Sequence, residues 1–167
     1  TLEDKKWTNI TELPFNSNDY NAAHPALSED EKTLYFASDM PGGFGSSDLY
    51  KVAINEDGSF GTPVNLGTSI NTPGRETFPF ISQENELYFA SDGRPGLGGL
   101  DIFVSKITKE GTFEEVQNVG EPINSKQDDF AFIINSKNRN GFFSSNRANG
   151  HGLDDVYRFT ENRRLIC

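Results

Sequence analysis

The chain has 167 residues and a formal net charge of −10, a length typical of one globular domain. It holds 14 Phe but only one Trp, one Met and one Cys, and an aromatic-rich composition of this kind favours strands over helices. The acidic balance, without a cluster of Lys and Arg, argues against a surface built for nucleic acid. No apolar run approaches the length of a membrane span.

One phrase occurs three times, as YFASDMPGGFGSSDLY from residue 35, YFASDGRPGLGGLDIF from residue 88 and FFSSNRANGHGLDDVY from residue 142. Recurrence at a nearly fixed spacing indicates a repeat architecture. We therefore expect a single domain over 1–167, with 161–167 as the start of a linker to a further domain. Its repeat units are expected at about 7–59, 60–112 and 113–160.

Four short strands are predicted in the first unit, at about 7–13, 23–27, 33–38 and 49–54, where apolar and polar residues nearly alternate. Tight turns such as NEDGS and TKEGT follow, with Gly where a positive φ is easiest. No segment carries a helical period with caps. Four strands per unit and a period near 50 residues are typical of a β-propeller blade. The predicted fold is all-β and of the β-propeller type, with three four-stranded antiparallel blades.

The segments LSEDEKTLYFASD and FISQENELYFASDGRPGLGGLDIF resemble the WD40-like repeat of TolB-type propellers, in the version found in bacterial envelope proteins of the OmpA family. The turn before the phrase departs from the S-x-D-G pattern of that repeat. The resemblance implies a scaffold that binds a protein or peptide partner and is not an enzyme. It also implies a periplasmic location, associated with the outer membrane through neighbouring domains. The alternative is a carbohydrate-binding or carbohydrate-active propeller that uses loop carboxylates.

Three blades are too few to close a ring, because propellers use about four to eight. Two arrangements remain open at this point. The chain is either part of a larger propeller or one half of a six-bladed ring formed by a homodimer through its blade edges. In the second arrangement, the segment 7–13 would complete the last blade of the partner chain.

The Gly-rich phrase is expected to shape a loop. Its glycines permit a tight excursion between strands, and polar side chains at both ends can accept hydrogen bonds from loop amides. A calcium site at these loops is an alternative, because GGFGSSD resembles a calcium-binding turn, but its Asp is one residue too late and the copies lie too far apart. No metal or cofactor is therefore expected. The loop-shaping residues are expected to be Asp39, Asp48, Asp92, Asp101, Asn146 and Asp155.

Binding is expected at the loops of one face. In a four-stranded blade, the Gly-rich loop and the long connection to the next blade emerge on the same face, and long loops on a rigid scaffold commonly carry binding residues. His24 and His151 lack the pattern of a catalytic triad. The candidate contact residues are Phe44, Arg75, Arg94, Leu97, Arg147 and His151.

Overall fold

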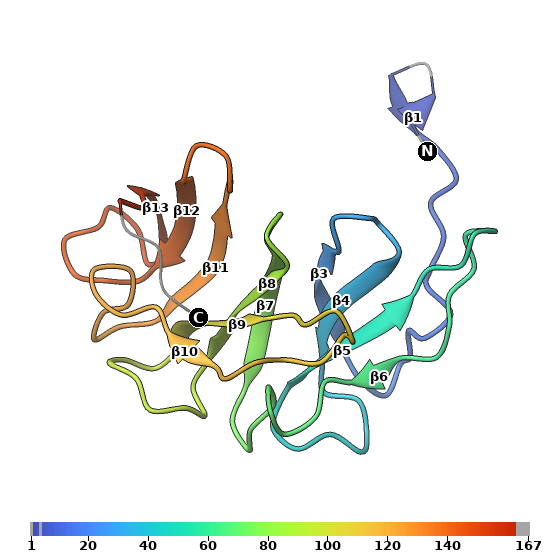
Figure 1. The fold of residues 1–167 in the computed structure, drawn as a ribbon, viewed down its shortest axis with the longest axis horizontal. Helices are drawn as coiled ribbons and strands as arrows, with labels where there is room; N and C mark the ends of the chain where they lie inside the picture. Colours follow the sequence, from blue (N-terminus) through green and yellow to red (C-terminus); the bar gives the residue numbers. More distant parts are fainter. Residues whose placement is uncertain (1, 4, 163–167) are drawn as a thin grey trace.

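The computed structural model of the chain describes residues 2–3 and 5–162, and in that part of the chain all regular structure is β-strand. Three antiparallel sheets follow one another in chain order and together form an arc (Figure 1). The expected all-β class with three blades is confirmed. Residues 163–167, which hold most of the predicted linker, lie outside the described residues.

In each blade, strands that are adjacent in sequence pair with one another. Blade 1 contains β3 (Ala22–Leu27), β4 (Thr33–Ser38), β5 (Asp48–Ala53) and β6 (Val64–Asn65). Blade 2 contains β7 (Glu76–Ile81), β8 (Glu86–Ser91), β9 (Asp101–Lys106) and β10 (Gln117–Asn118). Blade 3 contains β11 (Asp129–Ile134), β12 (Asn140–Ser145) and β13 (Asp155–Thr160). A hairpin of β1 (Leu2–Glu3) and β2 (Lys6–Trp7) precedes the blades.

Two details of the predicted blades are wrong. Residues 8–13 form no strand, and the fourth strand of blade 1 is β6, which pairs with β5. A fourth strand pairs with the third strand of its own blade, which comes before it in the chain, and the described residues hold no third strand before residue 8. Blade 3 has three strands instead of four within the described residues, because no segment there pairs with the open edge of β13.

The inner wall of the arc is formed by β3, β7 and β11, which are the first strands of the three blades and pack side by side. Each of these strands contains a β-bulge where its register with the second strand shifts. The bulge places one residue at positive φ, namely His24 (54°), Phe78 (49°) and Ala131 (52°). A bulge changes the direction of the side chains around it. All three blades therefore redirect side chains of the inner wall at equivalent positions of their first strands.

Two asparagines extend the short outer strands β6 and β10. The side-chain Oδ1 of Asn71 accepts a hydrogen bond from the backbone N–H of Leu49 at 2.8 Å, and its Nδ2 donates to the carbonyl of Leu49 at 3.0 Å. Asn124 makes the same two bonds to Ile102, at 2.8 and 2.9 Å. Each amide side chain therefore replaces one rung of a sheet at the outer edge of a blade.

The hydrophobic core lies between blades. Each blade presents one apolar face to the blade before it and one to the blade after it, and the faces meet in separate clusters. The cluster between blades 1 and 2 includes Tyr35, Leu49, Leu66, Ile70, Leu87 and Phe89. The cluster between blades 2 and 3 includes Tyr88, Ile102, Val104, Phe132 and Phe143. The other face of blade 1 is covered by the N-terminal segment, in a cluster of Phe15, Leu34, Phe36, Tyr50 and Val52.

Candidate binding face

The Gly-rich loops and the connections between blades emerge at one end of the three sheets, and we call it the loop face. In blade 1 the first strand begins at Ala22, opposite Ser38 at the end of β4, and Ser38 pairs with Asp48 at the start of β5. The loop 39–47 and the segment that enters β3 therefore emerge together. The same register recurs in the other two blades, so the loops 92–100 and 146–154 and the connections 66–75 and 119–128 also lie at this end.

A carboxylate holds the tip of each Gly-rich loop. In each blade it belongs to the first residue of the third strand and accepts hydrogen bonds from two consecutive backbone amides of the loop. The amide nitrogens of Phe44, Leu97 and His151 lie 2.6, 2.8 and 2.8 Å from the carboxylates of Asp48, Asp101 and Asp155, respectively. The backbone of each tip is therefore fixed by the blade beneath it.

The tips project apolar or aromatic side chains into solvent. The relative exposure of Phe44 is 50% and that of Leu97 is 47%, and His151 at the equivalent position is also exposed. A fixed backbone offers such a side chain for contact at little further entropy cost. Of the residues predicted from sequence, these three have the geometry of contact residues.

A second set of side chains ties the end of each second strand to the segment that enters the blade. Asp39, Asp92 and Asn146 accept hydrogen bonds from the backbone N–H of Asn21, Arg75 and Asp128 at 2.6, 2.6 and 2.8 Å. The two bonds from Asn21 hold the pKa of Asp39 below its usual value. Arg75 also forms an ion pair with Asp92 at 2.7 Å and is largely exposed, so its guanidinium is within reach of a ligand.

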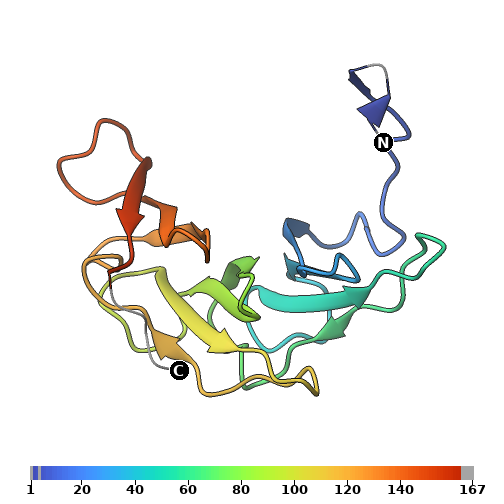
Figure 2. The ribbon, with the colours of Figure 1, turned by 45° about the horizontal axis from the view of Figure 1, so that its top comes forward.

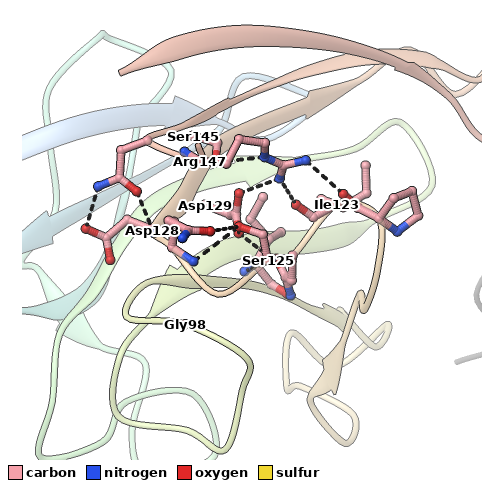
Figure 3. Close-up of polar contacts among 12 residues, drawn as sticks. Gly98, Ile123, Ser125, Asp128, Asp129, Ser145 and Arg147 are labelled. Atoms are coloured by element: carbon pink, nitrogen blue, oxygen red, sulfur yellow. Dashed lines mark hydrogen bonds and ion pairs between the residues drawn. The ribbon is translucent and has the colours of Figure 1, made fainter. Parts of the chain in front are cut away.

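The guanidinium groups of Arg94 and Arg147 bind backbone carbonyls of the chain. Nη2 of Arg94 donates to the carbonyls of Ser69 and Ile70 at 2.8 and 2.9 Å. Arg147 donates to the equivalent carbonyls of Pro122 and Ile123 at 3.1 and 2.6 Å (Figure 3). Burial lowers the pKa of Arg94. Both guanidinium groups therefore fasten the connection between two blades.

Two buried carboxylates at the blade junctions were not singled out from the sequence. Glu76 is fully buried and accepts hydrogen bonds from Thr72 and Ser91. Asp129, also fully buried, accepts hydrogen bonds from Ser125 and forms an ion pair with Arg147 at 2.6 Å (Figure 3). Both are the first residue of an inner strand and lie five residues after a repeated Asn, Asn71 or Asn124, which is the sequence signal that could have identified them.

An aromatic row crosses the three blades near the loop face, on the inner wall, and it was also not predicted. The ring of His24 in blade 1 stacks on Phe78 in blade 2, with centroids 3.8 Å apart, and Phe78 contacts Phe130 in blade 3 at 5.0 Å. His24 Nδ1 also lies 2.7 Å from the hydroxyl of Thr77, and burial lowers the pKa of the imidazole. His24 is exposed and the two Phe are half-buried, so the row offers aromatic surface to a ligand.

The loop carboxylates bind the chain itself. Each of those described above accepts hydrogen bonds from backbone amides, which occupy oxygens that a calcium ion would need, although the buried Oδ1 of Asp101 has no hydrogen-bond partner. In the described part of the chain, no group of three or more His, Cys, Asp or Glu side chains has the arrangement of a metal site. Residues 2–3 and 5–162 include no helix of the length and apolarity that crossing a membrane requires.

Comparison with known proteins supports the fold. No family model and no curated protein matches the chain. Among solved structures, prolyl oligopeptidase B from Galerina marginata, bound to a 35mer hydrolysis and macrocyclization substrate, matches 86% of this chain with a TM-score of 0.52 and 15% identity. A periplasmic gluconolactonase from Pseudomonas aeruginosa matches 72% with a TM-score of 0.46 and 13% identity. The chain covers 19% and 35% of these two proteins.

These matches settle one expectation and correct another. The propeller-type fold is confirmed by the solved structures and by the three antiparallel blades. The expectation that the chain is not an enzyme is corrected, because the solved structure that matches with a TM-score of 0.52 is of an enzyme, a prolyl oligopeptidase. Fold and sequence therefore give no ground for denying the chain a catalytic activity. At this level of identity, the likeness extends to the fold alone.

Proposed function

We propose that the chain is part of a β-propeller whose loop face binds a protein or peptide partner. The observation that carries the proposal is the aromatic row of His24, Phe78 and Phe130, which joins three blades at the end where the loops emerge. Aromatic side chains are enriched at protein interfaces and dominate their binding energy. The tips Phe44 and Leu97 add fixed apolar contacts on the same face.

A glycan held by loop carboxylates is the weaker hypothesis. Carbohydrate-active sites place two carboxylates opposite one another across a bond. Here the carboxylates of Asp48, Asp101 and Asp155 point back into their own loops and accept amide hydrogen bonds. The exposed side chains at the loop tips of blades 1 and 2 are the aromatic Phe44 and the aliphatic Leu97, which favours a peptide.

We further propose that the protein works in a bacterial envelope, on the periplasmic side of the outer membrane. This part of the proposal is supported by the resemblance of its repeats to those of TolB-type propellers in proteins of the OmpA family. Fractionation of the native host, followed by detection of the protein in the periplasmic or outer-membrane fraction, tests the location. Recovery from the cytoplasm alone would contradict it.

Selection of random displayed peptides on the intact chain tests the binding function. We expect selected peptides to be rich in apolar or aromatic residues, and we expect Phe44→Ser and His24→Ala each to raise their Kd by about tenfold, as loss of a central contact does. Val64→Ser is the matched control, because Val64 is equally exposed but lies on the outer strand β6.

Three results of this selection would overturn the proposal. One is the failure of every peptide to bind, and another is an equal loss of affinity in the control. The third is a glycan-array signal that depends on His24 while peptides do not compete for it.

A further inference from the structure

The two ends of the arc carry complementary halves of one blade junction. Blade 3 has its first three strands but no fourth strand among the described residues. Residues 12–18 are equivalent in sequence to 65–71 and 118–124, which form the fourth strand and the connection after it in blades 1 and 2. Within residues 2–3 and 5–162, the N-terminal end thus has the segment that blade 3 lacks, and the two lie at opposite ends of the arc (Figure 2).

The exposed face of blade 3 has the composition of a junction. Leu49 in blade 1 and Ile102 in blade 2 are 0% and 1% exposed because the next blade covers them, whereas Val156 at the equivalent position is 72% exposed. Phe142, equivalent to the buried Tyr35 and Tyr88, is also exposed. Apolar side chains are thus present where a following blade would bury them.

The backbone of β13 repeats the docking groups of the internal junctions. Leu49 and Ile102 offer their N–H and C=O to Asn71 and Asn124. Val156 has the same register against β12 as those residues have against their second strands. Its N–H and C=O therefore point away from β12, toward the open side of blade 3.

Gly152 gives an independent sign of the same junction. A methyl group at the equivalent Gly98 would collide with the carbonyls of Ser125 and Gln127 in the next blade, so close approach requires glycine there. At Gly152 the nearest atom to such a methyl group is the carbonyl oxygen of Asp154, at 3.2 Å. Among the described residues, none from another blade comes close enough to this position to require glycine.

The N-terminal segment packs on blade 1 in the place where the connections between blades pack on blades 2 and 3. Phe15 packs on Phe36 of blade 1 with centroids 4.8 Å apart. Phe36 is equivalent to Phe89 of blade 2, which packs with Ile70, although Phe15 aligns with Thr68 and Ser17 stands in the place of Ile70. Beside this segment lies a hollow of about 320 Å³, lined in part by Glu12, Ser17 and Asn18. In the internal junctions, the equivalent space is occupied by the third strand of the preceding blade, which Asn71 and Asn124 bind.

We propose that the exposed face of blade 3 docks on the N-terminal face of a second copy of this chain, where Asn18 binds Val156, and that two such junctions close a six-bladed ring. Both faces of the junction are present on the same chain, so a second copy supplies the missing half at each end. A head-to-tail contact of this kind closes into a ring when its rotation permits, and six blades lie within the usual range.

One pair departs from the internal junctions and gives a variant that strengthens docking. Asn65 donates its side-chain amide to the carboxylate of Asp48 at 2.6 Å. The equivalent pair across the proposed junction is Glu12 and Asp155, which carry like charges. Glu12→Asn restores the internal pattern, so it should lower the dissociation constant of the dimer several-fold.

Light scattering and sedimentation of the whole chain under reducing conditions, over a range of concentrations, test the proposal. We expect the mass of two chains for the wild type and for the control Val64→Asp, and the mass of one chain for Gly152→Ala and Val156→Asp. Both disruptive changes are at exposed positions, and circular dichroism verifies that the variants fold. A monomer at all concentrations would overturn the proposal, and the open edge of β13 would then pair with a different segment or partner.

Cross-linking tests the geometry of the ring. In a Cys167→Ser background, Asn18→Cys combined with Val156→Cys should form a closed covalent dimer under mild oxidation. Val64→Cys combined with Val156→Cys should not. Ladders of larger oligomers would overturn the closed ring, and so would a wild-type dimer that persists in Gly152→Ala and Val156→Asp.

Discussion

At the scale of single residues, one carboxylate fixes each loop tip. Asp101 is almost fully buried and accepts the amides of Leu97 and Gly98 at 2.8 and 3.1 Å. Its equivalent Asp155 in the end blade is only half-buried, and its hydrogen bonds from the amides of His151 and Gly152 are exposed to solvent. The same pair of carboxylate–amide hydrogen bonds therefore occurs at a buried site in blade 2 and at a solvent-exposed site in blade 3, which allows a matched comparison.

We expect Asp101→Ala to lower the free energy of unfolding by about 1–3 kcal/mol, because it leaves two loop amides without an acceptor in a site that water reaches poorly. Asp155→Ala should cost less, since water can bond to its amides. Urea denaturation of both variants measures the difference. Equal losses would show that burial does not set the value of this bond.

Asp92 permits a prediction about pH. Burial raises the pKa of its carboxyl, but the amide and guanidinium of Arg75 outweigh this and hold the pKa below 3.8. The depressed pKa means that the contribution to stability is present above 3.8 and is lost as the pH falls through the native value. Because Arg75 is exposed, the ion pair is worth at most about 1 kcal/mol.

The variant Asp92→Asn isolates that ion pair, because the equivalent Asn146 still accepts a backbone amide through Oδ1. We expect a small loss of stability at neutral pH that disappears in acid. Thermal unfolding of wild type and variant between neutral pH and pH about 3 checks this. A difference in stability between wild type and variant that grows on acidification would contradict this prediction.

At the scale of elements, the arginine and the buried carboxylate form one unit. Blade 3 pairs Arg147 with Asp129, whereas blade 1 has Met40 and Ala22 at the equivalent places. An uncharged pair therefore occupies the same fold in blade 1. In blade 2, where Gly93 stands in the place of Arg147, the buried Glu76 is held by hydrogen bonds from Thr72 and Ser91 instead.

Arg147→Met alone should destabilise the chain by about 3–5 kcal/mol, because it leaves a fully buried carboxylate without its cation. Adding Asp129→Ala, which copies the pair of blade 1, should restore much of the loss. A double-mutant cycle by urea denaturation measures the coupling. Additive losses would refute the interpretation of the two residues as a unit.

The sequence predicted the elements whose signal is local and repeated. The second and third strands of the blades and the Gly-rich loops between them follow from the phrase itself. The fourth strand was misplaced, because its partner is chosen by the position of the neighbouring blade and not by its own residues. Arg94 and Arg147 were taken for surface residues, since a guanidinium gives no sequence signal for the backbone carbonyls that it will meet. The aromatic row depends on a bulge, which no turn motif announces.

At the scale of the whole molecule, burial falls at the blade 3 end of the arc. β4 in blade 1 and β8 and β9 in the central blade are almost wholly buried, whereas β13 alternates between half-buried and exposed residues. In a repeat architecture, each unit is stabilised chiefly by its neighbours. The central blade has two neighbours within the chain and the end blades have one.

We expect amide hydrogen exchange to be slowest in β8 and fastest in β13 when the chain is dilute, because protection follows the local free energy of opening. As the concentration rises and copies associate, the amide of Val156 should become protected. Exchange followed by mass spectrometry at two concentrations measures both effects. Uniform protection across the blades at high dilution would contradict this expectation.

The bulge on the inner wall has a consequence for how such a protein can diversify. The bulge requires a left-handed backbone conformation at this position. His24, Phe78 and Ala131 all adopt it, although their side chains are an imidazole, a phenyl ring and a methyl group. The bulge therefore tolerates side chains of different chemistry. A single mutation at this position in one blade can change the surface of the inner wall without changing the fold of the other blades, so ligand preference can evolve one blade at a time.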